Sequence, residues 1–76
     1  MTNKFGSFVR TERIKLGYSG VAFAKKLNIT SVQLNNVETG KNLPRISTVE
    51  NYARVLNVPK ETLTGLYLED YESRKL

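Results

Sequence analysis

The chain has 76 residues, no cysteine, no histidine and a formal net charge of +5. Its length suits one domain, and the lack of cysteine excludes disulfide bonds and thiolate metal sites, as expected in a reducing cytoplasm. The sequence offers no catalytic histidine or cysteine, no phosphate-cradling glycine loop and no paired acids in an apolar setting, which argues against an enzyme. We also expect no cofactor, no metal and no small-molecule ligand.

Nothing in the sequence suggests a membrane protein or an exported one. No apolar run approaches the roughly 18 residues that a membrane-spanning helix needs. The start, MTNKFGSFVRTER, lacks the long apolar run of a signal peptide. We therefore expect a cytoplasmic protein without a membrane partner.

Positive charge is concentrated in the first part of the chain. Residues 1–45 hold eight basic and two acidic side chains, whereas residues 46–76 hold four basic and five acidic ones. A polyanion such as DNA would therefore meet the first part of the chain. An ordinary solvated basic surface is the alternative, and charge alone leaves it open.

A first helix is predicted from Asn3 or Lys4 to Leu16, with Gly17 directly after its end. Four apolar residues form a stripe at helical spacing and are expected to face the core: Phe5, Phe8, Val9 and Leu16.

A second helix is predicted at about 20–27. Ser19 before it is a typical N-cap residue. Asn28 after it tolerates the left-handed backbone conformation in which many helices end. The buried face is expected to contain Phe23, Ala24 and Leu27.

A third helix is predicted at about 31–39, after a short turn. Thr30, followed three residues later by Gln33, is a capping box that opens the helix, and Gly40 is its expected stop. Two helices that cross through so short a turn need a small residue where they touch and apolar residues that face inward. Ala24, Leu34 and Val37 meet these needs, so the pattern is that of a helix-turn-helix.

Two more helices complete the predicted domain, which spans residues 1–76. The fourth is expected to begin near Ile46 or Ser47, where Ser47 and Glu50 match a second capping box. Its apolar residues recur at helical spacing and are expected to complete the core: Ile46, Val49, Tyr52, Ala53 and Leu56. Pro59 suits the first position of a C-terminal helix and tail at about 59–76. Five helices without a strand pattern predict an all-α fold.

The pattern from about Phe5 to about Leu66 resembles the helix-turn-helix DNA-binding domains of the phage repressor and Cro type, also called the Xre type. The matching residues are Arg10, Arg13, Gly17, Ser19, Ala24, Leu27, Leu34, Val37, Glu38, Gly40, Lys41 and Pro44. The resemblance implies a five-helix, lambda-repressor-like fold and a sequence-specific regulator of transcription that binds double-stranded DNA. It also implies a structural ion pair between Arg13 and Glu38.

If the third helix lies in the major groove, the outward-facing residues near its N-terminus read base edges. These candidate residues are Ser31, Val32, Asn35 and Asn36. Asparagine can bond bidentately to adenine, serine can bond several base edges, and a valine methyl group can pack on the thymine methyl group. Ordinary polar surface residues are the alternative.

Phosphate contacts are expected first at the N-terminus of the second helix, because its free backbone N–H groups favour anions. Relatives usually have a glutamine at the position of Gly20, where it bridges phosphate and the recognition helix. Because this chain lacks that glutamine, we expect other residues to make the phosphate contacts. The complete set of candidate phosphate contacts is Arg10, Ser19, Gly20, Lys25, Gln33, Lys41, Asn42 and Arg45.

We expect a homodimer, because one helix-turn-helix contacts only half of a typical site. Apolar residues near the end of the chain exceed what so small a core needs, which predicts an interface. The expected interface residues are Val58, Tyr67, Leu68 and Tyr71, and the operator would be an inverted repeat. A protein-interaction module of the same fold, such as an antitoxin or an accessory subunit, is the alternative function.

Overall fold

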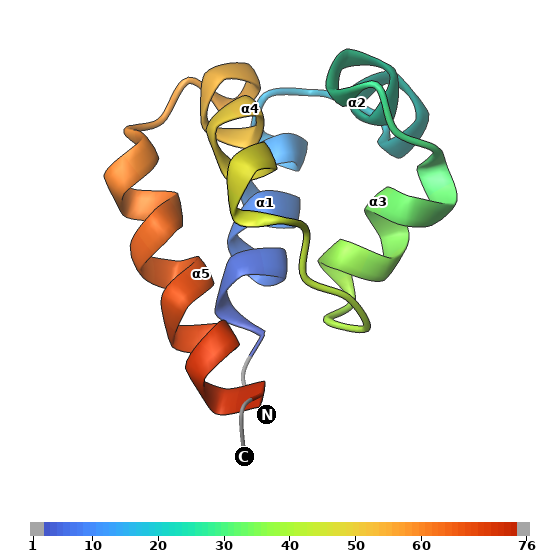
Figure 1. Ribbon diagram of the computed structural model, residues 1–76. Helices are drawn as coiled ribbons and strands as arrows, with labels where there is room; N and C mark the ends of the chain where they lie inside the picture. Colours follow the sequence, from blue (N-terminus) through green and yellow to red (C-terminus); the bar gives the residue numbers. More distant parts are fainter. Residues whose placement is uncertain (1–2, 75–76) are drawn as a thin grey trace.

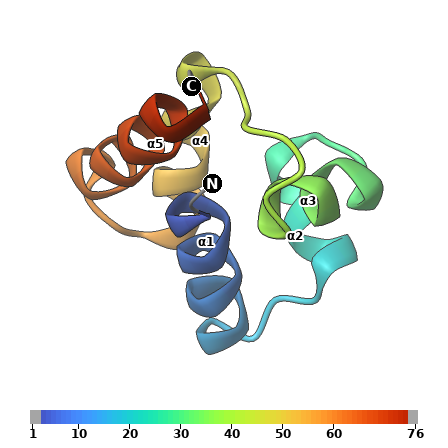
Figure 2. The same cartoon turned by 90° about the horizontal axis from the view of Figure 1, so that it is seen from below.

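The computed structural model describes residues 3–74, which form five α-helices (Figure 1). Their bounds are α1 (Lys4–Lys15), α2 (Gly20–Leu27), α3 (Ser31–Glu38), α4 (Ile46–Leu56) and α5 (Lys60–Arg74). The helices α1, α4 and α5 pack together, and α2 and α3 lie as a pair against α1 and α4 (Figures 1 and 2). The predicted all-α, five-helix class is therefore confirmed. No helix among residues 3–74 is both long enough and apolar enough to cross a membrane.

The helix ends follow from local sequence. Asn28 and Asn57 adopt left-handed conformations with φ of 60° and 58°, and they end α2 and α4. Gly17 and Gly40 have φ of 81° and 84° in the turns after α1 and α3. Glycine and asparagine tolerate this region at the lowest steric cost, so each helix stops where the sequence allows the backbone to reverse.

Four aromatic rings occupy the centre of the core. The Phe5 ring packs edge-on against Tyr52 and Tyr67, with ring centroids 5.5 and 5.9 Å apart, and Tyr52 also contacts Phe23. Every helix contributes to this core, which contains Phe5, Val9, Phe23, Ala24, Leu27, Leu34, Val37, Val49, Tyr52, Ala53, Leu56, Leu63 and Tyr67. Edge-to-face aromatic pairs add about 0.5 to 1.5 kcal/mol beyond their buried area. The core thus joins α5 firmly to α1.

Two residues predicted for the core are instead exposed. Leu16 lies beyond the last residue of α1, where the backbone turns away from the core, and Ile46 is the first residue of α4. The second capping box was also wrong. The helix α4 begins one residue before Ser47, Arg45 takes the N-cap position without a side-chain cap, and the Thr48 Oγ1 donates to the Arg45 carbonyl at 2.8 Å.

The prediction that Tyr67 lies in the dimer interface was wrong. Its side chain is only 7% exposed because it packs on Phe5, so it belongs to the core rather than to a free surface. Leu68 and Tyr71 are 48% and 44% exposed, and Val58 is partly buried against the core. The Tyr71 ring stacks on Tyr67 at a centroid distance of 6.2 Å.

Candidate nucleic-acid interface

Side-chain caps hold the starts of α2 and α3. The Ser19 Oγ accepts a hydrogen bond from the Ala22 N–H at 3.1 Å, which caps α2. The predicted box at α3 is formed: the Gln33 N–H donates to Thr30 Oγ1 at 3.0 Å, and the Thr30 N–H donates to Gln33 Oε1 at 2.9 Å. An N-cap of this kind stabilises a helix by about 0.5 to 2 kcal/mol. The start of α3 is therefore held without help from distant residues.

The helix α3 has one buried face and one outward face. Leu34 and Val37 point into the core, while Val32 on the outward face is 68% exposed. Ser31 and Asn35 are also exposed, and Asn36 is partly buried. The residues predicted to read bases thus share the outward face, with Asn36 at its edge.

The ion pair between Arg13 and Glu38 is formed at the far end of α3. The Arg13 Nε donates to Glu38 Oε2 at 2.7 Å, and Nη2 donates to Oε1 at 3.1 Å. The Nη1 group donates to the Tyr18 carbonyl at 2.8 Å. The two side chains are only 12% and 5% exposed. A bidentate pair in this setting fixes the position of α3 on α1.

The pKa values of the neighbouring groups reflect this buried charge. The hydrogen bond to Glu38 raises the pKa of the Arg13 guanidinium, against an opposing effect of burial. Burial, and then the negative charge of Glu38, raise the pKa of Tyr52 to about 12. The Glu38 carboxylate therefore raises the pKa values of both its ion-pair partner Arg13 and the core residue Tyr52.

The N-cap residue of α1 and the last residue of α5 also hold the end of α3 and the turn after it. The Asn3 side-chain amide donates to the Glu38 carbonyl at 3.1 Å, and the Arg74 Nη2 donates to the Gly40 carbonyl at 2.7 Å. Gly6 packs so closely on α3 that a Cβ atom there would collide with the Val37 carbonyl oxygen. These contacts satisfy acceptors that a helix end otherwise leaves unpaired.

Asp70 joins the C-terminal helix to the start of α1. Its side chain is fully buried, and its two carboxylate oxygens accept from the Lys4 and Phe5 N–H groups at 3.0 and 2.8 Å. An acidic group suits this place, because the first N–H groups of a helix lack internal partners and carry partial positive charge. Asp70 thus caps α1 from a distance of 65 residues in the chain.

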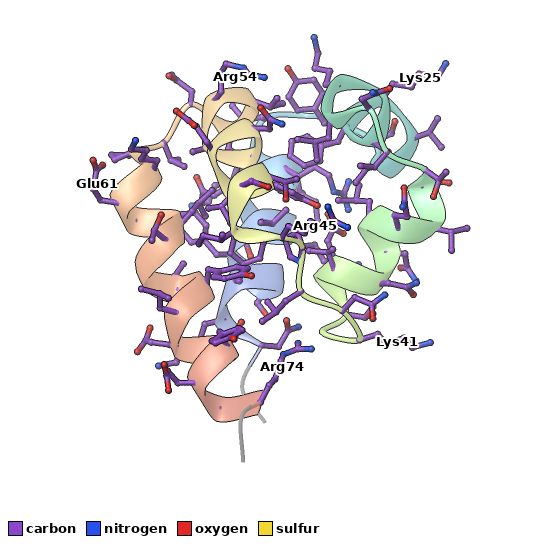
Figure 3. The ribbon with its side chains drawn as sticks, viewed as in Figure 1. Lys25, Lys41, Arg45, Arg54, Glu61 and Arg74 are labelled. Carbon is purple, nitrogen blue, oxygen red and sulfur yellow. The ribbon has the colours of Figure 1, made fainter. Side chains whose placement is uncertain are left out.

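The predicted phosphate-binding residues fall into separate groups. Ser19, Gly20 and Lys25 belong to α2 and its cap, and Arg10 is exposed on α1. Three others, Gln33, Asn42 and Arg45, line a hollow between α3 and α4 of about 370 Å³. Figure 3 places Lys25 and Lys41 at opposite ends of the side that carries α3, with Arg45 between them. Positive charge therefore flanks the outward face of α3.

Sequence reasoning missed four residues that hold this arrangement: Asn3, Gly6, Asp70 and Arg74. Each acts between parts of the chain that are 31 or more residues apart. No local pattern marks such contacts, and Asp70 and Arg74 were expected only to belong to the C-terminal helix and tail. Asp70 and Arg74 do share one face of α5 with Tyr67 at helical spacing, but this signal alone does not reveal their partners.

Comparison with known proteins gives one match. A family model described as helix-turn-helix matches residues 9–63, which cover α2, α3, α4 and parts of α1 and α5. No curated protein and no solved structure matches the chain.

Proposed function

Since the chain belongs to the Cro/repressor (Xre) type of helix-turn-helix family, whose members are DNA-binding domains and not enzymes, we propose that it regulates transcription by binding a specific operator. It binds as a homodimer to an inverted repeat in double-stranded DNA. Each subunit inserts α3 into the major groove, and two such helices lie about one helical turn of DNA apart.

The outward face of α3 is the observation that carries this proposal. It combines the exposed methyl groups of Val32 with the exposed polar side chains of Ser31 and Asn35. In the major groove, the valine packs on a thymine methyl group, asparagine bonds adenine N6 and N7, and serine bonds a nearby edge. Asn36, which is partly buried, contacts a base from the edge of this face.

Backbone contacts set the position of α3 on the duplex. The Ser19 side chain occupies the Ala22 N–H, whereas the N–H groups of Gly20 and Val21 remain at the start of α2 to bind a phosphate oxygen. Lys41, Asn42 and Arg45 contact the backbone from the other end of α3. Such contacts orient the protein but carry no sequence information directly.

A titration against a mixed-sequence duplex of about 30 base pairs at several salt concentrations tests this function. We expect the affinity to fall by about 10³-fold or more between about 50 and about 200 mM salt if six or more phosphates are contacted. A protein-interaction module would show no association with DNA that depends on salt in this way. That result would contradict the proposed function.

Dimerisation through α5 gives a separate prediction. Leu68 is 48% exposed on α5, and the net charge of residues 46–76 is low enough to limit repulsion between two subunits. We expect sedimentation with operator DNA to give two subunits per duplex, and Leu68→Ala to lower this ratio. Ile14→Ala, which removes an exposed apolar residue from α1, is the control and leaves the ratio unchanged. A wild type that binds its operator as a single subunit would refute the dimer.

A further inference from the structure

A second hollow, of about 450 Å³, lies between the loop after α3 and the last two turns of α5. Its lining residues are Lys41, Asn42, Leu43, Tyr67, Tyr71 and Arg74. Figure 3 shows Lys41 and Arg74 at the same end of the molecule, away from Arg54 at the opposite end. The hollow therefore adjoins the loop that leaves the recognition helix.

Arg74 is held in place by one of its guanidinium nitrogens, and its Nε has no hydrogen-bond partner within residues 3–74. Its Nη2 donates to the Gly40 carbonyl at 2.7 Å, which fixes the guanidinium beside Lys41. Its Nε is buried and lacks a hydrogen-bond partner within residues 3–74. An arginine has five N–H donors, and burying one without a partner destabilises the fold. The residue as a whole is only partly buried, so the guanidinium N–H donors that Gly40 leaves unused can meet an acceptor that comes from outside the protein.

Neither cation of the hollow forms an ion pair within the described part of the chain. The ion pairs of the described residues use Glu69 with Lys4, Glu38 with Arg13 and Glu12 with Lys15. Asp70 accepts from the start of α1. No carboxylate in residues 3–74 pairs with Arg74 or Lys41. Lys41 and Arg74 therefore line one hollow without an ion pair inside residues 3–74, and an anion there would stabilise both.

We propose that Arg74 and Lys41 form a site for a phosphate oxygen, filled by the backbone of DNA beside the contact made by α3. This inference rests on the proposed function. The planar guanidinium suits a phosphate group, and its bond to Gly40 holds it ready, so little side-chain entropy is lost on binding. The last turn of α5 thus belongs to the DNA-binding surface. Free inorganic phosphate is the other source of the same chemistry.

The test compares the salt dependence of binding to the mixed-sequence duplex for wild type, Arg74→Gln and Arg54→Gln. Loss of one phosphate contact flattens the plot of log Kobs against log salt concentration by about 0.9. We expect this change for Arg74→Gln and no change for Arg54→Gln, which removes an exposed arginine from the last turn of α4. Arg74→Lys keeps the charge and should retain most of the slope. Circular dichroism at the binding temperature checks that each variant is folded.

A second experiment distinguishes the DNA backbone from free inorganic phosphate as the ligand of this site. Thermal melts of wild type and Arg74→Gln are recorded with inorganic phosphate and with chloride at equal ionic strength and no DNA. Greater stabilisation of the wild type by phosphate, with an unchanged salt slope, supports the site and assigns free phosphate as its ligand. An unchanged slope without that stabilisation overturns the site, even if Arg74→Gln weakens binding, because Arg74 would then only position the loop. If the wild type binds no DNA, the proposed function fails, and the phosphate arm still reports on this site.

Discussion

Replacing Arg13 by alanine is expected to lower the free energy of unfolding by about 3 to 5 kcal/mol. The substitution leaves the Glu38 carboxylate without a counter-charge at a side-chain exposure of 5%, and it leaves the Tyr18 carbonyl without its donor. Whole domains are stable by only about 5 to 15 kcal/mol, so the loss is large for a chain of this size. Denaturant unfolding of wild type and Arg13→Ala measures it.

Two comparisons make this prediction specific. Glu38→Ala and the double variant complete a cycle, and the double variant should be more stable than the sum of the single losses predicts. Lys15→Ala breaks an exposed pair with Glu12 on the same helix and should cost about 0 to 1 kcal/mol. Small and additive losses at Arg13 and Glu38 would mean that the pair does not hold α3 in place.

Asp70→Ala is expected to destabilise the fold by about 2 to 4 kcal/mol, since the substitution removes the acceptor of two N–H groups at the start of α1. One of these donors, the Phe5 N–H, is buried and cannot turn to water instead. The effect should exceed that of an ordinary N-cap, which is at most about 2 kcal/mol. Thermal and denaturant unfolding measure the loss.

The neighbouring acid on α5 provides the control. Glu69 pairs with Lys4 at 3.1 Å, but both side chains are about half exposed, so Glu69→Ala should cost about 0 to 1 kcal/mol. An equal loss for the two substitutions would show that Asp70 acts through its general charge and not through the two hydrogen bonds.

Local signals predicted much of the fold. Ser19, Thr30 with Gln33, and Asn28 each act within three or four residues of their partners, so their roles can be read from sequence order. The ion pair of Arg13 and Glu38 was predicted only through the family resemblance, since the two residues are 25 positions apart. Together, the local sequence patterns and the family resemblance predicted which face of α3 points outward.

The errors arose where packing between distant elements decides the outcome. Apolar periodicity placed Leu16 and Ile46 in the core, although both lie at helix ends where the backbone points them outward. Tyr67 was predicted to lie in an exposed interface because the sequence alone does not show that the core has room for its ring beside Phe5. The roles of Asp70 and Arg74 depend on α5 returning to α1 and α3, which no short pattern in the sequence encodes.

These contacts give α3 support at both of its ends. The capping box fixes its start, and Arg13, Asn3 and Arg74 hold its end. A reading helix needs such support, because its side chains must meet base edges within a few tenths of an ångström to form bidentate hydrogen bonds. The outward face can then carry the specificity while the remainder of the domain carries stability.

Selection of bound duplexes from a random pool by wild type and Asn35→Ala tests the central claim, that the outward face of α3 reads bases. Asn35 is exposed, so its substitution should leave the fold intact. The wild type should enrich an inverted repeat, and Asn35→Ala should lose preference at one position of each half-site, at a cost of about 1 to 3 kcal/mol. A wild-type pool that stays random, or a variant that keeps every base preference and binds all sequences more weakly, would contradict base reading by this face.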